Sequence, residues 1–195
     1  GNQRGVGQAI RDCYSGKRED LFVMTKIPGG LHVSEALAAL EENLVEMQLD
    51  HVDHVMVHYP SDWHASPDRA NKAVRQETWL ALEHVYYKGQ ARSIGISHYC
   101  SQHIHDILEV ATVVPSINQV EYHVGSGDVN DVIQSCRQHN ITFMSYSPLC
   151  GPCQASPEHS LISGELVTSI AKKYNVTGSH TSVLAIYRPA SAYEE

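Results

Sequence analysis

Two polar side chains suited to acid–base chemistry come at the ends of predicted strands. Lys26 lies near the end of the apolar run from Leu21 to Ile27. His58 lies at the end of a second run, two residues before Pro60, which cannot continue a strand. The carboxyl ends of parallel strands are where α/β proteins keep their active sites. We therefore take Lys26 and His58 as candidate catalytic residues. The structural alternatives are a solvent-facing or ion-paired lysine and a hydrogen-bonded core imidazole.

Two other patterns resemble binding motifs but lack the spacing that such motifs need. His51 and His54 fall on opposite faces of a strand, so these histidines together with His58 do not predict a metal site. The glycine pair Gly5 and Gly7 lacks both a preceding strand and a third glycine, and it indicates a helix start rather than a dinucleotide fingerprint.

Cys150 and Cys153 form a CxxC pair after a predicted strand, which is typical of thiol–disulfide exchange proteins. We keep thiol–disulfide redox chemistry at this pair as an alternative function. The chain has five cysteines, an odd number, so the set as a whole favours reduced thiols over a disulfide framework.

Apolar periodicity places these residues on alternating strands and helices. Strands are predicted at 21–27, 50–60, 91–97, 117–123 and 141–147, and helices at 2–13, 101–111 and 129–139. Apolar positions within 37–47, 79–86 and 166–174 mark three further helices, the second of which should end at Gly89. Ser101 is the expected N-cap of the helix over 101–111. The alternation predicts an α/β fold with a parallel sheet, either an open doubly wound sheet or a (β/α)8 barrel.

Length and charge limit the class of protein and its partners. At 195 residues and 42% hydrophobic the chain predicts a single domain over 1–195. A net charge of −8 without a basic cluster disfavours nucleic acid and anionic membranes and favours a small-molecule substrate. No apolar run reaches the roughly 20 residues of a membrane span, so we expect a cytoplasmic protein. Nothing in the sequence sets an oligomeric state.

An ordered set of short segments resembles the aldo-keto reductase family. The segments are Gly1-Asn2 with 5–10, then 21–26, 49–53, 57–60, 89–97, 118–123 and 146–149. The resemblance implies an incomplete (β/α)8 TIM barrel in which strands three to seven are recognisable. It also implies an oxidoreductase that reduces aldehydes or ketones to alcohols with hydride from NADP(H), with a small-molecule carbonyl substrate.

The resemblance also assigns roles to particular positions. Lys26 and His58 match the family's catalytic lysine and histidine, and Tyr59 with His58 matches the substrate-binding positions. The positions implied to bind the cofactor are Ser97, His98 and Gln119 at the nicotinamide carboxamide, Tyr146 stacked on its ring, and Ser147 and Leu149 near its phosphates.

The chain departs from the family pattern at three places. The family's tyrosine and aspartate would precede Gly1, His98 replaces an asparagine, and the basic segment for the 2′-phosphate would follow Arg188. We therefore expect these 195 residues to be part of a longer chain and to be inactive alone. The other alternative is a catalytically silent, cofactor-binding or regulatory member of the same fold.

Overall fold

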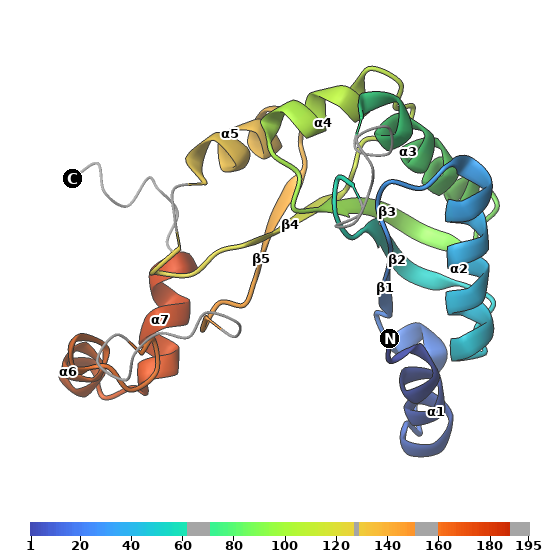
Figure 1. Ribbon diagram of the computed structural model, residues 1–195. Coiled ribbons are helices and arrows are strands. Elements are labelled where there is room, and N and C mark those ends of the chain that lie inside the picture. The colour runs from blue at the N-terminus through green and yellow to red at the C-terminus, as the bar shows by residue number, and fades with distance from the viewer. Residues whose placement is uncertain (62–70, 127–128, 151–159, 188–195) are drawn as a thin grey trace. The chain divides into compact units, whose positions relative to one another are not determined.

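The computed structural model describes residues 1–61, 71–126, 129–150 and 160–187 (Figure 1). Along these residues helices alternate with strands, as the apolar pattern predicts. The elements are α1 Gln3–Cys13, β1 Met24–Ile27, α2 Val33–Met47, β2 Val52–Val57, α3 Lys72–Tyr87, β3 Ala91–Ser97, α4 Ser101–Leu108, β4 Ile117–Glu121, α5 Asn130–Gln138, β5 Thr142–Tyr146, α6 Glu165–Tyr174 and α7 Gly178–Tyr187, with a short 3-10 helix at Arg18–Asp20.

The five strands form one sheet in the order β1-β2-β3-β4-β5. β2 pairs in parallel with β1 and with β3, with Lys26 beside Met56 and Met56 beside Gly95. A doubly wound sheet reverses its strand order at a switch point, whereas a β/α barrel adds each strand beside the one before it. The observed order is therefore that of part of a barrel.

The chain divides into two compact units, and the boundary passes through β4 and β5. Unit 1 comprises residues 1–118 and 131–143, and unit 2 comprises residues 119–130 and 144–195. The single domain expected over 1–195 remains a prediction.

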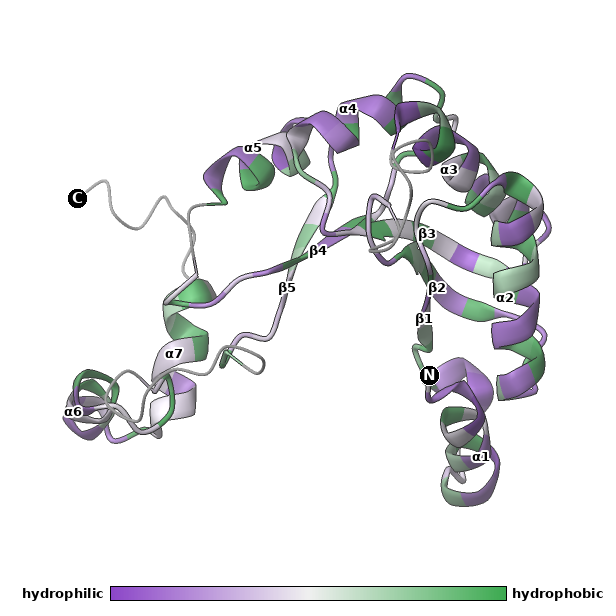
Figure 2. Cartoon of the chain, in the orientation of Figure 1, coloured by the Kyte–Doolittle hydropathy of each residue, from purple (hydrophilic) through white to green (hydrophobic). Residues whose placement is uncertain are grey.

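The core of unit 1 lies between its strands and the helices on one of their faces. α2 contacts β1, and α3 contacts β2 and β3 (Figure 1). Both helices carry hydrophobic and hydrophilic residues (Figure 2). Their buried apolar side chains, with Trp79 fully buried, belong to one core cluster with those of β2, whose six residues are all buried. Helices that cover a parallel sheet in this way explain its nearly continuous apolar runs.

Gly7 lets α1 and α2 approach each other closely. A Cβ at this position would collide with the carbonyl oxygen of Met47, the last residue of α2. Arg11 of α1 donates a hydrogen bond to the same oxygen at 3.0 Å. Gly7 thus serves helix packing, in line with the rejection of a dinucleotide fingerprint.

Two local predictions were wrong. β1 begins at Met24 rather than at Leu21, because the carboxylate of Asp53 accepts the Val23 N–H at 2.8 Å in place of a strand carbonyl. The N-cap of α4 is Cys100 rather than Ser101. Asn118 bonds both the N–H and the carbonyl of Tyr99 and so sets where the helix begins, while the Ser101 hydroxyl donates to the carbonyl of Asp131.

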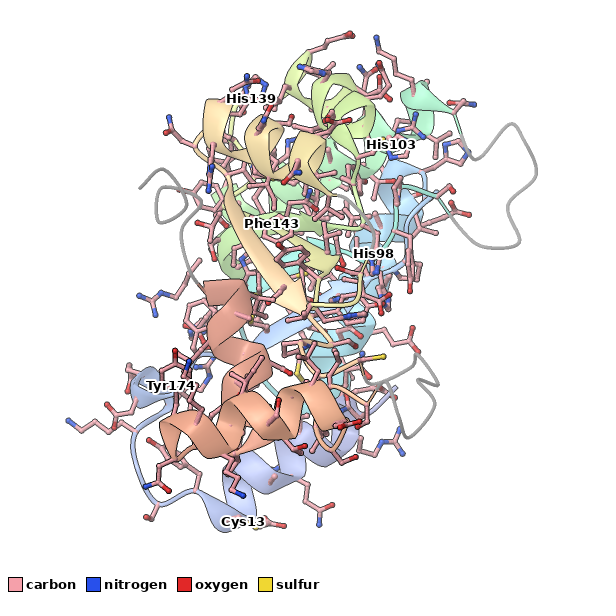
Figure 3. All side chains as sticks on the ribbon, turned by 90° about the vertical axis from the view of Figure 1, so that its left-hand side faces the viewer. Cys13, His98, His103, His139, Phe143 and Tyr174 are labelled. Atoms are coloured by element: carbon pink, nitrogen blue, oxygen red, sulfur yellow. The ribbon has the colours of Figure 1, made fainter. Side chains whose placement is uncertain are left out.

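In unit 2, α6 and α7 pack against each other. Asn175, in a left-handed backbone conformation, is the C-cap of α6. The Ser182 hydroxyl of α7 donates to the Leu161 carbonyl at 2.6 Å. Gly178 begins α7 so close to the Ile162 carbonyl that a Cβ would not fit. Figure 3 labels Tyr174, the last residue of α6. Within the described part of the chain, no helix combines the length and apolarity needed to cross a membrane.

Candidate active site

Lys26, near the end of β1, lies beside the last residue of β3. Its Nζ donates a hydrogen bond to Ser97 Oγ at 3.3 Å, and Ser97 is fully buried. The adjacency follows from the fold, because parallel strands bring their carboxyl ends to the same edge of the sheet. Burial lowers the pKa of Lys26, so its ammonium is a better acid than an exposed lysine.

His98 follows β3 in a left-handed backbone conformation, with φ 60°, and is labelled in Figure 3. Its Nδ1 lies 2.9 Å from Ser97 Oγ and 3.1 Å from the backbone carbonyl of His58. A carbonyl oxygen can only accept, so Nδ1 must carry the proton. In the neutral ring, Nε2 is then the hydrogen-bond acceptor.

His58, directly after β2, belongs to a cluster of three rings. Tyr59 stacks on His58 and on His98, with ring centroids 4.4 Å apart in each pair. The pKa of His58 is lowered first by partial desolvation and then by the positive charges of Lys26 and His98. The neutral imidazole is therefore favoured near pH 7, and the ring stays accessible to a ligand.

A pocket of about 610 Å³ in unit 1 is lined by both Lys26 and His58. Its wall includes Asn43 of α2, whose Nδ2 donates to the Lys26 carbonyl at 3.1 Å. Gln3 of α1 donates to Asn43 Oδ1 at 2.8 Å. Gln3 of α1 and Asn43 of α2 thus support the backbone of Lys26 through a chain of two hydrogen bonds.

Asn43 could not be identified from the sequence as a functional residue, because a single asparagine within an amphipathic helix indicates no function by itself. What could have identified Asn43 is its place among the apolar positions of the helix. Asn43 is followed by Leu44, a core residue, and precedes Met47, also buried, so it falls on the buried side of α2 where a polar residue needs a partner.

The other predicted cofactor residues belong to unit 2. Gln119 of β4 and Tyr146 of β5 are half-buried, and Gln119 Nε2 lies 3.1 Å from Met144 Sδ. Tyr146 donates from its hydroxyl to Glu121 Oε2 at 3.1 Å. Ser147 has a left-handed backbone, with φ 51°, and its carbonyl accepts the Cys150 N–H at 2.8 Å in a turn that contains Leu149.

The structure therefore brings the predicted residues together in two groups. Lys26, His58, Tyr59, Ser97 and His98 form one cluster in unit 1. Gln119, Tyr146, Ser147 and Leu149 lie on β4, on β5 and in the turn after it, in unit 2.

The CxxC pair is only partly described. Cys150 is disulfide-bonded, which makes the expectation of reduced thiols wrong at this position, while Cys13, Cys100 and Cys136 are free. Cys153 lies outside the described residues. Among the described residues, no group of three or more histidine, cysteine or acidic side chains could hold a metal ion.

The sequence of the chain is similar to those of known reductases. The model of the aldo/keto reductase family matches residues 1–160. A D-galacturonate reductase from Hypocrea jecorina is 31% identical over 96% of this chain and 62% of its own length. A glyoxal reductase from Bacillus subtilis is 33% identical over 89% of this chain and 56% of its own length.

Solved structures of aldo-keto reductases are similar to this chain in fold. An aldo-keto reductase from a deep-sea metagenome library of the Medee basin superposes with a TM-score of 0.75 at 31% identity, over 91% of this chain and 60% of that one. The aldo-keto reductase of Bombyx mori in complex with NADP also gives 0.75, at 27% identity, over 91% and 59%.

The strand order and the cluster of polar side chains at the strand ends define an α/β protein of the barrel type. The chain belongs to the aldo/keto reductase family, and the expected incomplete (β/α)8 barrel is confirmed. It spans about three fifths of the length of the curated relatives it matches.

Proposed function

We propose that the natural protein carrying these residues is an NADP(H)-dependent reductase of aldehydes or ketones. The observation that carries the proposal is one pocket lined by both Lys26 and His58. Ser97 and His98 join the two, through the Lys26 Nζ bond to Ser97 and the His98 bond to the His58 carbonyl. Family membership supports carbonyl reduction, and the Bombyx mori relative in complex with NADP supports the choice of cofactor.

The donor and acceptor set fits a nicotinamide. A carboxamide presents one carbonyl acceptor and one N–H donor group, and Ser97 and His98 carry a hydroxyl donor and, at Nε2, an imidazole acceptor. His98 can thus take over the role of the family's asparagine in the tautomer that the His58 carbonyl selects. Within unit 2, the family resemblance assigns a carboxamide contact to Gln119, stacking on a nicotinamide ring to Tyr146, and positions toward the phosphates to Ser147 and Leu149.

The bound cofactor would supply hydride to the substrate carbonyl carbon. Neutral His58, beside Tyr59, would donate a hydrogen bond to the carbonyl oxygen and orient it. Lys26 would place an ammonium beside the group that protonates the resulting alkoxide and would lower that group's pKa. In the family that group is a tyrosine, and an aspartate pairs with the lysine. Neither of these two positions is among the 195 residues. We therefore propose that the 195 residues alone do not turn over.

Steady-state NADPH oxidation with a simple aromatic aldehyde tests the proposal in the natural protein. Lys26→Met should lower kcat by about 10²-fold or more, and His58→Gln by a similar amount, because each removes a positioned polar group from the transition state. Lys17→Met, at an exposed lysine outside the pocket, is the matched control and should leave kcat unchanged. Full activity in Lys26→Met would refute the assignment.

Two alternatives make different predictions. A catalytically silent member would bind NADPH in the natural protein without any turnover. A thiol–disulfide protein would reduce insulin disulfides and lose that activity in Cys150→Ser. The cytoplasmic location remains a prediction from composition.

A further inference from the structure

Glu121 lies on the same face of β4 as Gln119, because side chains two residues apart on a strand point the same way. Met144 and Tyr146 have the same relation on β5. Side chains of the two strands contact each other. Gln119 Nε2 lies 3.1 Å from Met144 Sδ, and the Tyr146 hydroxyl lies 3.1 Å from Glu121 Oε2. The backbone agrees, because the Tyr122 N–H donates to the Tyr146 carbonyl at 3.3 Å.

The hydroxyl of Tyr146 donates its hydrogen bond to a carboxylate, Glu121 Oε2. The main chain fixes one end of the tyrosine side chain, and this bond anchors the other end, so the position of the ring is determined. The acceptor is ionised, and a hydrogen bond to an ionised acceptor is stronger than one to a neutral acceptor at the same distance. It also leaves more electron density on the phenol ring than a neutral acceptor would.

His123 contacts the second oxygen of the same carboxylate. Its Nδ1 accepts the Gly125 N–H at 3.1 Å, so in the neutral ring the proton is on Nε2. Nε2 lies 3.6 Å from Glu121 Oε1, and His123 is buried while the Glu121 side chain is 37% exposed. A buried histidine thus faces one carboxylate oxygen while Tyr146 bonds the other.

We propose that Glu121 is a positioning residue for Tyr146 and that its charge favours the oxidised cofactor over the reduced one. The inference rests on the proposed function, in which Tyr146 stacks on the nicotinamide. The oxidised nicotinamide ring is cationic and the reduced ring is neutral. An electron-rich aromatic face attracts a cation, so the charge on Glu121 stabilises NADP⁺ more than NADPH.

Two substitutions separate position from charge. Glu121→Gln keeps an oxygen that can accept from the Tyr146 hydroxyl but removes the charge, so the dissociation constant should rise about fivefold for NADP⁺ and stay nearly unchanged for NADPH. Glu121→Ala removes the acceptor as well, and the dissociation constants for both forms should rise. Both are measured by fluorescence titration of the natural protein.

The controls isolate the nicotinamide end of the cofactor. The affinity for 2′-phospho-ADP-ribose, which lacks the nicotinamide, should be unchanged in every variant. Tyr146→Phe should reproduce the effect of Glu121→Ala, and adding Glu121→Ala to Tyr146→Phe should weaken binding no further. Glu165→Gln, at an exposed carboxylate that begins α6, should leave all three dissociation constants unchanged.

The outcomes distinguish the two levels of the proposal. If the unsubstituted protein binds NADP⁺ and Glu121→Gln weakens NADP⁺ and NADPH equally or not at all, this inference is overturned and the proposed function stands. An additive loss in the double variant would also overturn it. If the unsubstituted protein binds neither form, the proposed function fails together with the inference.

Discussion

His54 is fully buried on β2, and among the described residues its Nε2 has no hydrogen-bond partner. Its Nδ1 lies 2.8 Å from Ser93 Oγ, whose hydroxyl also contacts the Asp53 carbonyl. Desolvation lowers the pKa of His54 from 6.5 to about 4. The folded protein therefore holds this imidazole neutral at a pH where the unfolded chain already protonates it.

The first prediction is a loss of stability between pH 6.5 and pH 4. Because the folded-state pKa is depressed, the unfolded state binds more protons in this window, and the unfolding free energy should fall by about 3 kcal/mol as the pH drops. Urea unfolding followed by tryptophan fluorescence at a series of pH values measures it. His54→Leu should flatten the curve, and His84→Leu, at an exposed histidine of α3, should not. An unchanged slope in His54→Leu would contradict the prediction.

Asn43 links three elements through its side-chain amide. It joins α1 through Gln3 and β1 through the Lys26 carbonyl, and it is 8% exposed on α2. Removing it leaves a carbonyl and an amide without these partners.

The second prediction concerns this link. Asn43→Ala should lower the unfolding free energy by about 1–3 kcal/mol, and it should lower kcat because the backbone of Lys26 loses its support. Asn43→Asp should do no better, since a carboxylate cannot donate to the Lys26 carbonyl. Chemical denaturation and the NADPH oxidation assay report the two effects. Glu41→Ala, on the exposed side of α2, is the control, and equal behaviour of Asn43→Ala and this control would refute the role.

Arg75 of α3 and Asp106 of α4 form a buried ion pair. Arg75 bonds Asp106 Oδ2 through Nε at 3.2 Å and through one terminal nitrogen at 2.7 Å, and Gln102 bonds Oδ1 at 3.1 Å. Burial alone would raise the pKa of Asp106, but hydrogen bonds from Arg75 and Gln102 and the charges of Arg75 and Lys72 outweigh it and lower the pKa. The carboxylate is therefore charged at neutral pH.

The third prediction concerns the removal of one member of this buried ion pair. Arg75→Met should cost about 3–5 kcal/mol, because Asp106 stays buried without its cation. The double variant Arg75→Met with Asp106→Leu should recover most of that loss, as measured by a double-mutant cycle of unfolding free energies. A double variant as unstable as the sum of the two single variants would show that the helices are not joined by this pair.

The elements could be predicted from the sequence because their apolar periodicity is local. The strand over 91–97 was predicted at its observed bounds, and Lys26 and His58 do lie at neighbouring strand ends. What could not be predicted depends on contacts between distant residues. Asp53 shortens β1, Asn118 moves the cap of α4 to Cys100, and Glu121 becomes informative only once Tyr146 is seen beside it.

Across the whole molecule, the order of the strands decides between the two folds that the sequence left open. The sequential order β1-β2-β3-β4-β5 identifies part of a barrel, and the solved relatives confirm it. The family, and the roles of the residues at the strand ends, were predicted from the resemblance of short sequence segments to aldo-keto reductases. The chemistry of His98 came from the structure, since the tautomer depends on the backbone carbonyl of His58.

We propose that the natural protein transfers hydride to a carbonyl at the site of Lys26 and His58. The most direct measurement uses NADPH deuterated at the transferable position of nicotinamide C4, with a simple aromatic aldehyde, and locates the deuterium in the product by mass spectrometry. We predict an alcohol with one deuterium on its carbinol carbon, and about a hundredth of that amount or less with Lys26→Met in the same assay time. No deuterated alcohol from the unsubstituted natural protein, despite bound cofactor, would contradict the claim.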